Sequence, residues 1–297
     1  MSMNYQSANR RTRIALATCE AERTLTNEDR ILMQQLRTMG FRAEPLVWTS
    51  DADYQDTLVV IRSCWDYHLQ PARFLQWTES VGRKGGKLLN PASTVRWNHD
   101  KRYLRELQAK GVRVAPTVWV ESNASTTLQQ IVDETGWQEI VVKPAISATA
   151  WQTFRRHRDD VHRSESSFTE SVRGGCVLVQ QFLTDILVQG EWSFVFFNGI
   201  YSHAALKRPA QSDFRVQREF GGFVDCHVRP SPRLIDAAIE ALRQCPDAAS
   251  LYARVDGIET NEGLVIVEIE QIEPALFLDD QTTARFSHAI LARCDFV

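Results

Sequence analysis

Residues 252–278 constrain this chain most, because four carboxylates lie on what reads as a single β-hairpin. Two β-prone runs flank the turn residues 260–263, a pattern typical of two strands joined by a short turn. Glu268 and Glu270 are two positions apart, so on a strand both point to the same face. Asp256 lies at the end of the preceding strand and can reach that face. We therefore expect these three carboxylates to lie together.

Carboxylates that converge on one point repel each other strongly unless a cation lies between them. Hard oxygen ligands suit Mg²⁺, above all when phosphate oxygens complete its octahedron, and Mn²⁺ is the alternative ion. A half-exposed strand edge with outward-pointing acids explains the hairpin at least as well when it is taken alone. Features far upstream decide between these two interpretations.

Length, charge and cysteine usage narrow the class of protein. The 297-residue chain is long enough for about two domains of ~150 residues each. Its net charge of −3 mixes acids and bases, with no basic stripe of the kind that binds nucleic acid. No apolar run approaches the ~20 residues that span a membrane. Six scattered cysteines without a C-x-x-C pair argue against a zinc site and favour reduced thiols, so we expect a cytoplasmic protein.

The first part of the chain predicts an open α/β sheet. We expect an apolar strand at 13–18 and then a helix at 27–39 that ends at Gly40. Two further strands follow at 41–49 and 58–61. This β-α-β-β order is typical of an open α/β sheet, in which ligands bind outside the carboxyl ends of the strands. The residues that follow the last of these strands are therefore candidates for binding.

Arg62, Asp66 and Tyr67 lie in that position, directly after the strand at 58–61. An arginine there can hold a carboxylate through two parallel hydrogen bonds. Asp66 and Tyr67 could hold an amine or a hydroxyl group. The alternative is a capped strand end with an Arg–Asp ion pair and a packed Trp65.

Further downstream, strands alternate with loops of unusual composition. We expect a strand at 140–144 that carries Lys143 near its end, followed by a small-residue stretch at 145–150 and another strand at 177–183. A hairpin around an Asn-Gly turn is expected at 190–206, and a basic loop at 207–223. The charged run 155–163 shows no metal-ligand geometry, so we expect a solvated loop there. Amphipathic helices are predicted at 232–244 and 282–293.

Taken in order, these features resemble the ATP-grasp enzymes over roughly residues 97–278. No single feature is specific for this family. The specific signal is the combined order and spacing of the cations, the small-residue loop, the hinge at 180–183 and the acidic hairpin. The segments R-S-C-W-D-Y-H, L-L-N-P, W-N-H-D-K-R-Y-L and E-x-E-x-I-E-P-A-L-F resemble those of the cyclo-ligases of D-cycloserine biosynthesis, which close O-ureido-D-serine. The broader pattern is similar to that of prokaryotic glutathione synthetases.

The resemblance implies an α/β fold (an α+β composite) of the ATP-grasp type in three parts. Residues 1–97 would form an N-terminal open α/β sheet domain on the substrate side. Residues 98–183 would form a small α+β lid domain, and residues 184–297 a C-terminal α+β catalytic domain. Within the lid domain, residues 145–163 would close over the reaction. Homodimers are common among such enzymes, so a homodimer is an open alternative to a monomer.

The resemblance also implies how ATP would be bound. Lys101 and Lys143 would neutralise the phosphates, and the small-residue loop with Ser147, Ala148 and Thr149 would cover them. The hinge would hold adenine, and it consists of Gln180, Gln181, Phe182 and Leu183. Glu191 would bond the ribose. Family loops at this position are often rich in glycine, which this loop is not.

For the reaction, the resemblance assigns magnesium to Asp256, Glu268 and Glu270, where family members often have Asn at the third position. Arg215 and Lys207 would stabilise charge on the transferring phosphoryl group. The small amino-acid-like substrate would contact residues from several segments, namely Arg62, Asp66, Tyr67, Gly221, Gly222 and Glu273.

Three functions are compatible with these residues. The first is an ATP- and Mg²⁺-dependent ligase that forms a C–N bond through an acyl phosphate, with cyclisation of O-ureido-D-serine to D-cycloserine as its most specific form. The second is a two-substrate carboxylate–amine ligase, as in glutathione synthetase. The third is a non-catalytic nucleotide-binding module, against which the three mutually repelling acids argue.

Overall fold

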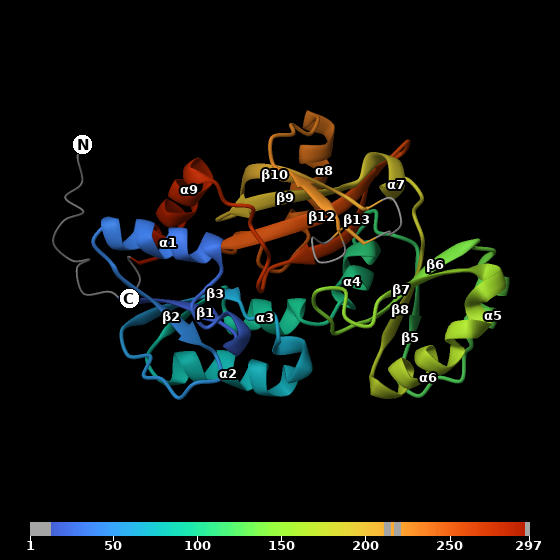
Figure 1. Ribbon diagram of the computed structural model, residues 1–297, viewed down its shortest axis with the longest axis horizontal. Helices are drawn as coiled ribbons and strands as arrows, with labels where there is room; N and C mark the ends of the chain where they lie inside the picture. The colour runs from blue at the N-terminus through green and yellow to red at the C-terminus, as the bar shows by residue number, and fades with distance from the viewer. Residues whose placement is uncertain (1–12, 211–214, 217–220, 295–297) are drawn as a thin grey trace.

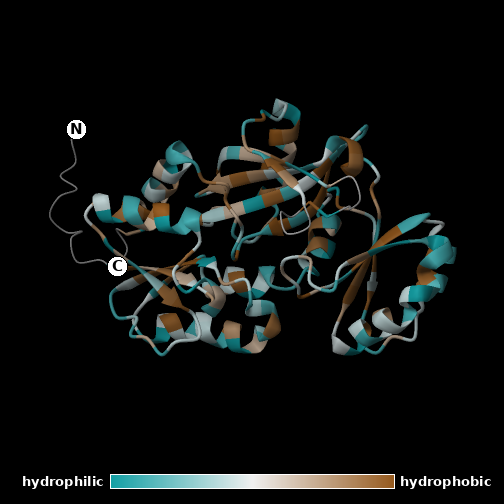
Figure 2. Ribbon diagram, in the orientation of Figure 1, coloured by the Kyte–Doolittle hydropathy of each residue, from teal (hydrophilic) through white to brown (hydrophobic). Residues whose placement is uncertain are grey.

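Three β-sheets and the helices that cover them make up the protein (Figure 1). The computed structural model describes residues 13–210, 215–216 and 221–294, so part of the predicted basic loop 207–223 lies outside the described residues. The architecture is the predicted α/β composite, with one parallel and two antiparallel sheets. Figure 2 shows hydrophobic residues gathered on the strands, while the helices alternate between hydrophobic and hydrophilic faces.

The N-terminal sheet is the predicted open α/β sheet, and all its strands are parallel, in the order β2-β1-β3-β4. Its strands are β1 (Arg13–Thr18), β2 (Arg42–Val47), β3 (Thr57–Ser63) and β4 (Lys87–Leu89). Every residue of β3 is buried, which agrees with the apolar run at residues 58–61 in its centre.

Helices cover both faces of this sheet (Figure 1). On one face lie α1 (Asn27–Thr38) and α9 (Asp280–Leu291), and on the other lies α2 (Pro71–Arg83). Alternate residues of β1 divide between the two cores: Ile14 and Leu16 pack with α1 and α9, whereas Ala15 and Ala17 pack with α2. The last helix of the chain therefore returns to complete the first domain.

The second sheet is antiparallel, with the order β5-β8-β6-β7, and one face carries two helices. Its elements are β5 (Thr117–Val120), β6 (Glu139–Pro144), β7 (Phe154–His157) and β8 (Val177–Gln181), with α5 (Leu128–Thr135) and α6 (Glu165–Gly174). The expected solvated loop at 155–163 was wrong. Its first residues pair with the edge of β6, Arg155 bonds to Glu139 through two guanidinium nitrogens, and Val161 is buried in the short helix that follows.

The central sheet has the order β11-β10-β9-β12-β13 and contains the predicted hairpins. Its strands are β9 (Glu191–Phe197), β10 (Ile200–Arg208), β11 (Phe223–Asp225), β12 (Tyr252–Thr260) and β13 (Gly263–Glu270). Asn198 and Gly199 both have positive φ angles, of 50° and 76°, as a two-residue hairpin turn between twisted strands requires.

One face of the central sheet is apolar and the other carries charge. The apolar face packs against α8 (Pro232–Arg243) and α4 (Tyr103–Ala109), while the short helices α3 (Ala92–Asn98) and α7 (Ile186–Gln189) lie at its margins. The Tyr103 hydroxyl donates to the Ile269 carbonyl at 2.8 Å, so α4 is tied to the acidic hairpin. None of the helices within the described ranges is long and apolar enough to cross a bilayer.

Asn90, just after β4, joins the N-terminal sheet to the acidic hairpin. Its buried amide nitrogen donates to the carbonyls of Tyr252 and Gln271 at 2.9 and 2.8 Å, and its oxygen accepts from the Leu251 amide at 2.7 Å. These three bonds fix both ends of the hairpin against the first domain.

We expect Asn90→Ala to lower the free energy of unfolding by about 3 kcal/mol, because it removes three buried hydrogen bonds to backbone groups. Urea denaturation measures this loss. Gln34→Ala on the exposed side of α1 is the matched control, with a change within about 0.5 kcal/mol. A decrease in the free energy of unfolding below ~1 kcal/mol for Asn90→Ala would contradict the role of Asn90 in holding the acidic hairpin against the N-terminal sheet.

Candidate active site

A cavity of about 800 Å³ lies where the three sheets meet, and it collects residues from all of them. Its walls include most of the predicted site residues: Arg62, Tyr67, Lys101, Lys143, Ser147, Ala148, Thr149, Gln180, Gln181, Phe182, Leu183, Glu191, Lys207, Arg215, Asp256, Glu268, Glu270 and Glu273. Three predicted residues, Asp66, Gly221 and Gly222, are not among the residues that line it.

Asp66 has a structural partner instead of a place in the cavity. Its carboxylate accepts a hydrogen bond from Trp48 Nε1 at 2.7 Å, and the short helix Tyr67–Leu69 begins directly after it. That turn directs Tyr67 into the cavity and leaves Asp66 outside. Gly221 is exposed and, with Gly222, precedes the edge strand β11, so the predicted contacts of these three residues with substrate do not follow from the structure.

Arg62 lines the cavity but is already paired. It is only 3% exposed, and its Nε donates to Asp29 of α1 at 2.8 Å. Ser63 donates to the other carboxylate oxygen of Asp29 at 3.2 Å. This is the strand-end Arg–Asp pair of the structural alternative, with Asp29 rather than Asp66 as the acid. Its main effect is to anchor the start of α1 beside the cavity.

The register of the acidic hairpin brings charges into cross-strand pairs. Asp256 of β12 lies opposite Glu268 of β13, and Arg254 lies opposite Glu270. All four therefore share the face that borders the cavity. The predicted grouping of Asp256, Glu268 and Glu270 on one face is observed, but a guanidinium group stands among them.

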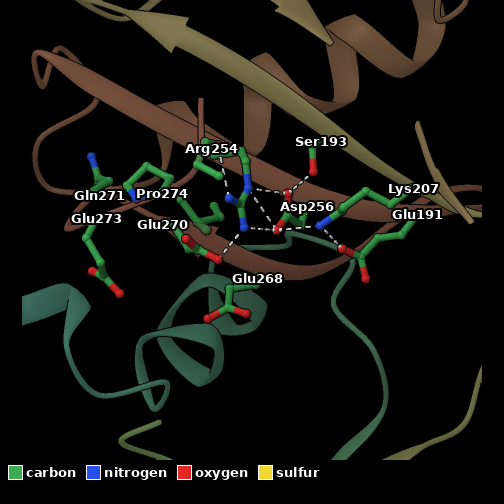
Figure 3. Close-up of polar contacts among 12 residues, drawn as sticks. Glu191, Ser193, Lys207, Arg254, Asp256, Glu268, Glu270, Gln271, Glu273 and Pro274 are labelled. Carbon is green, nitrogen blue, oxygen red and sulfur yellow. Dashed lines mark hydrogen bonds and ion pairs between the residues drawn. The ribbon is translucent and has the colours of Figure 1, made fainter. Parts of the chain in front are cut away.

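Asp256 is the centre of a buried network of hydrogen bonds (Figure 3). The Arg254 guanidinium donates to both of its carboxylate oxygens, with Nε–Oδ1 and Nη2–Oδ2 distances of 2.9 and 2.8 Å. Ser193 donates to it at 2.6 Å, and Lys207 lies 3.4 Å away. Lys207 also forms an ion pair with Glu191. One acid thus ties β9, β10 and β12 together.

Burial and neighbouring charges set the proton affinities of this network. Burial alone would raise the pKa of Asp256, but Arg254 and Lys207 outweigh it and hold the pKa well below its usual range. Burial raises the pKa of Glu270 to about 7, with Glu268 and Asp256 acting in the same direction against Arg254. Glu270 is therefore the carboxyl group of the pair Asp256 and Glu270 whose charged form is less stabilised by the protein.

Lys101 connects the hairpin to the small-residue loop. Its Nζ lies 3.1 Å from Glu268 and donates to the Ser147 carbonyl at 2.6 Å. Lys143 also lines the cavity, and no hydrogen bond or ion pair of its amine is found in the described part of the chain. Burial lowers the pKa of Lys143, and Glu268 opposes that shift. An amine in this state is suited to meet an anion in the cavity.

The small-residue loop after β6 closes one side of the cavity. Thr149 and Ala150 both have positive φ angles, of 51° and 55°, which is uncommon for residues with a side chain. Ala148 packs against the core of the N-terminal domain, and the Trp151 ring lies 5.4 Å from that of His68. The loop therefore spans from the second sheet to the first.

The opposite side of the cavity is apolar and contains the predicted hinge. Phe182 packs in a cluster with Ile186, Val216 and Ile258, and Leu183 packs against that cluster. The Arg155 guanidinium carbon lies 3.8 Å from the Phe182 ring centroid. A flat apolar wall of this kind suits a purine base.

The donor set fits a divalent cation in its chemistry. Asp256, Glu268 and Glu270 supply hard oxygen ligands on one face. Among the residues that the structure describes, however, no three acidic, histidine or cysteine side chains converge closely enough to hold an ion as they stand. Arg254 and Lys101 form ion pairs with these acids in place of a metal ion, so the metal assignment stays a prediction.

Arg254 is the site residue that our sequence analysis missed. It is buried, lines the cavity, and also bonds to Glu270. The signal was present, since an Arg-x-Asp spacing on a strand places both side chains on one face. Arg254 stands two positions before Asp256 on β12, so the alternation that places Asp256 on the cavity face places this cation there as well.

Solved structures share this arrangement of sheets. A RimK-domain ATP-grasp protein from Sphaerobacter thermophilus matches with a TM-score of 0.66 and 17% identity, over 96% of this chain and 99% of that one. A D-alanine–D-alanine ligase from Bacillus anthracis, solved with ATP, matches with a TM-score of 0.62 and 13% identity over 94% of each chain. Together with the relatives described next, the fold and the cavity define this chain as an ATP-dependent ligase with the ATP-grasp fold.

Within that class the chain resembles DcsG. The family model for the N-terminal domain of D-cycloserine synthetase DcsG matches residues 14–90. The cycloserine biosynthesis protein DcsG of Streptomyces lavendulae is 29% identical over 293 residues, covering 88% of this chain and 92% of that protein. The crystal structure of D-cycloserine synthetase DcsG matches with a TM-score of 0.83 and 27% identity, over 95% of this chain and 99% of that one.

We expect Lys143→Met to weaken ATP binding about 10- to 100-fold, because it removes a cavity cation while keeping the length and apolar character of the side chain. Isothermal titration calorimetry with ATP measures the change. Lys84→Met, at the exposed end of α2, is the control and should bind ATP like the unaltered protein. Unchanged affinity in Lys143→Met would place the phosphates elsewhere.

Proposed function

We propose that this ligase uses ATP and Mg²⁺ to form a C–N bond on a small amino-acid-like carboxylate, with cyclisation of O-ureido-D-serine to D-cycloserine as its reaction. The observation that carries the proposal is the single cavity that joins an apolar wall, two lysines, a paired Arg254–Asp256 and the acids of β13. The similarity to DcsG over most of both chains supports the choice of substrate.

In this proposal, the cavity orients ATP from one end to the other. Adenine lies against Phe182 and Leu183, and Glu191 lies near the ribose. Lys101 and Lys143 neutralise the phosphates, and the backbone of residues 145–150 covers them. This arrangement points the γ-phosphate toward the acidic hairpin, where the second reactant must enter.

Asp256, Glu268 and Glu270 are the residues that would hold Mg²⁺ when it arrives with the nucleotide. The ion supplies neutralisation of phosphate charge. Their oxygen donors and their place on one face of the cavity support this assignment. Arg254 would then share Asp256 and Glu270 with the ion, and its remaining hydrogen-bonding capacity can turn toward an anion in the cavity.

Arg254, Lys207 and Arg215 all line the cavity and supply positive charge for phosphoryl transfer. An oxygen of the substrate carboxylate attacks the γ-phosphorus, ADP leaves, and an acyl phosphate forms. The ureido nitrogen that is bonded to the side-chain oxygen then attacks the acyl carbon and displaces phosphate, which closes the ring. After ring closure, water cleaves the bond between that nitrogen and the ureido carbonyl carbon, so that carbamate leaves as CO₂ and NH₃ and D-cycloserine remains. The small-residue loop excludes water, which would otherwise hydrolyse the acyl phosphate.

The test is ADP release with ATP, Mg²⁺ and O-ureido-D-serine as the only carboxylate. We expect one ADP per molecule of substrate consumed, without any added amine. Turnover only after an amine is added would support the two-substrate ligase instead. ATP binding without turnover on O-ureido-D-serine, alone or with amines, would contradict the proposed reaction.

Glu268→Gln should lower kcat/KM by about 10³-fold, because it removes a charge that lies beside both Lys101 and the phosphate end of the cavity. The coupled ADP-release assay measures the loss. Glu262→Gln, in the exposed turn of the same hairpin, keeps full activity as the control. Full activity in Glu268→Gln would remove this acid from the reaction.

A further inference from the structure

Glu273, three residues beyond β13, is a buried acid on the cavity wall. The residue is only 8% exposed and lines the cavity. Its backbone carbonyl accepts from Trp65 Nε1 at 3.2 Å, so its main chain is held against the N-terminal domain. Within the described residues, no hydrogen bond or ion pair reaches its side-chain oxygens, and Figure 3 shows them without a dashed contact.

Tyr67 is a second buried polar group of the same wall. It is 4% exposed, and its ring packs 5.0 Å from that of Phe74, which fixes its direction. No hydrogen bond of its hydroxyl is found in the part of the chain that the structure describes, although the residue lines the cavity. Burial raises the pKa of Tyr67, and Glu273 is the strongest of the charges that raise it further. Both groups line the same cavity.

The cations near this space are already committed to other acids. Arg62 pairs with Asp29, and Arg254 pairs with Asp256 and Glu270. Lys101 pairs with Glu268. A buried carboxylate is unfavourable unless it is paired, so a protein that keeps one on a cavity wall provides a site for a cation or a hydrogen-bond donor.

We propose that Glu273 and Tyr67 hold the ammonium group of the substrate and so restrict the ligase to carboxylates that carry a primary amine. The inference rests on the proposed function, which it makes more specific. The ammonium donates to the Glu273 carboxylate and to the Tyr67 hydroxyl oxygen. Because Glu273 follows the acidic hairpin closely, an amine held there keeps a carboxylate on the adjacent carbon near the reacting end of ATP.

The test compares O-ureido-D-serine with its analogue that lacks the amine, 3-(ureidooxy)propanoate. For the unaltered protein we expect kcat/KM to be about 100-fold higher with the amine. Glu273→Gln should lose most of that preference by raising KM for O-ureido-D-serine, with KM for ATP unchanged. Tyr67→Phe should lose part of it, and Glu262→Gln should keep it.

Equal use of both substrates by the unaltered protein would overturn the inference, and so would an equal loss with both substrates in Glu273→Gln. If neither substrate is turned over, the proposed function fails, and calorimetry decides the inference separately. In the presence of ADP and Mg²⁺, D-serine should then bind at least ~10-fold more tightly than 3-hydroxypropanoate, and Glu273→Gln should abolish that difference. Absence of any difference in the unaltered protein would overturn it.

Discussion

The paired hydrogen bonds between Arg254 and Asp256 are the interaction on which the rest of the site depends. Both residues are buried, and an unpaired carboxylate at this depth would be strongly unfavourable. Asp256 also holds Ser193 of the neighbouring strand β9 and Lys207 of β10, the strand beyond it. The pair therefore makes it possible to place several charges in the protein interior, and it fixes the strands that carry them.

The distribution of charge divides the cavity into two ends. Lys101 and Lys143 lie beside the small-residue loop, where positive charge can receive phosphates. At the other end, burial raises the pKa values of Glu270 and Glu273, so a cation bound there would stabilise their charged forms. A ligase that brings an anionic nucleotide to a substrate with an amine needs this separation, because each end then attracts the part of the reactants that it must hold.

Much of the fold could be predicted because it follows from local periodicity. The hairpin around Asn198 and the acidic hairpin depend on turn residues and alternation, which a single sequence displays. Asp66 could not be placed, since the direction of a side chain in a strand-end turn depends on a distant partner, here Trp48. Arg62 was placed at the cavity correctly, but its partner Asp29 lies on a helix whose contact only tertiary packing determines.

The central claim is that a substrate carboxylate is activated by transfer of phosphate from ATP. It can be tested directly with O-ureido-D-serine labelled with ¹⁸O in both carboxylate oxygens. Passage through an acyl phosphate predicts that each molecule of inorganic phosphate released with ADP contains one ¹⁸O atom, which mass spectrometry measures. Release of unlabelled phosphate during product formation would contradict the account.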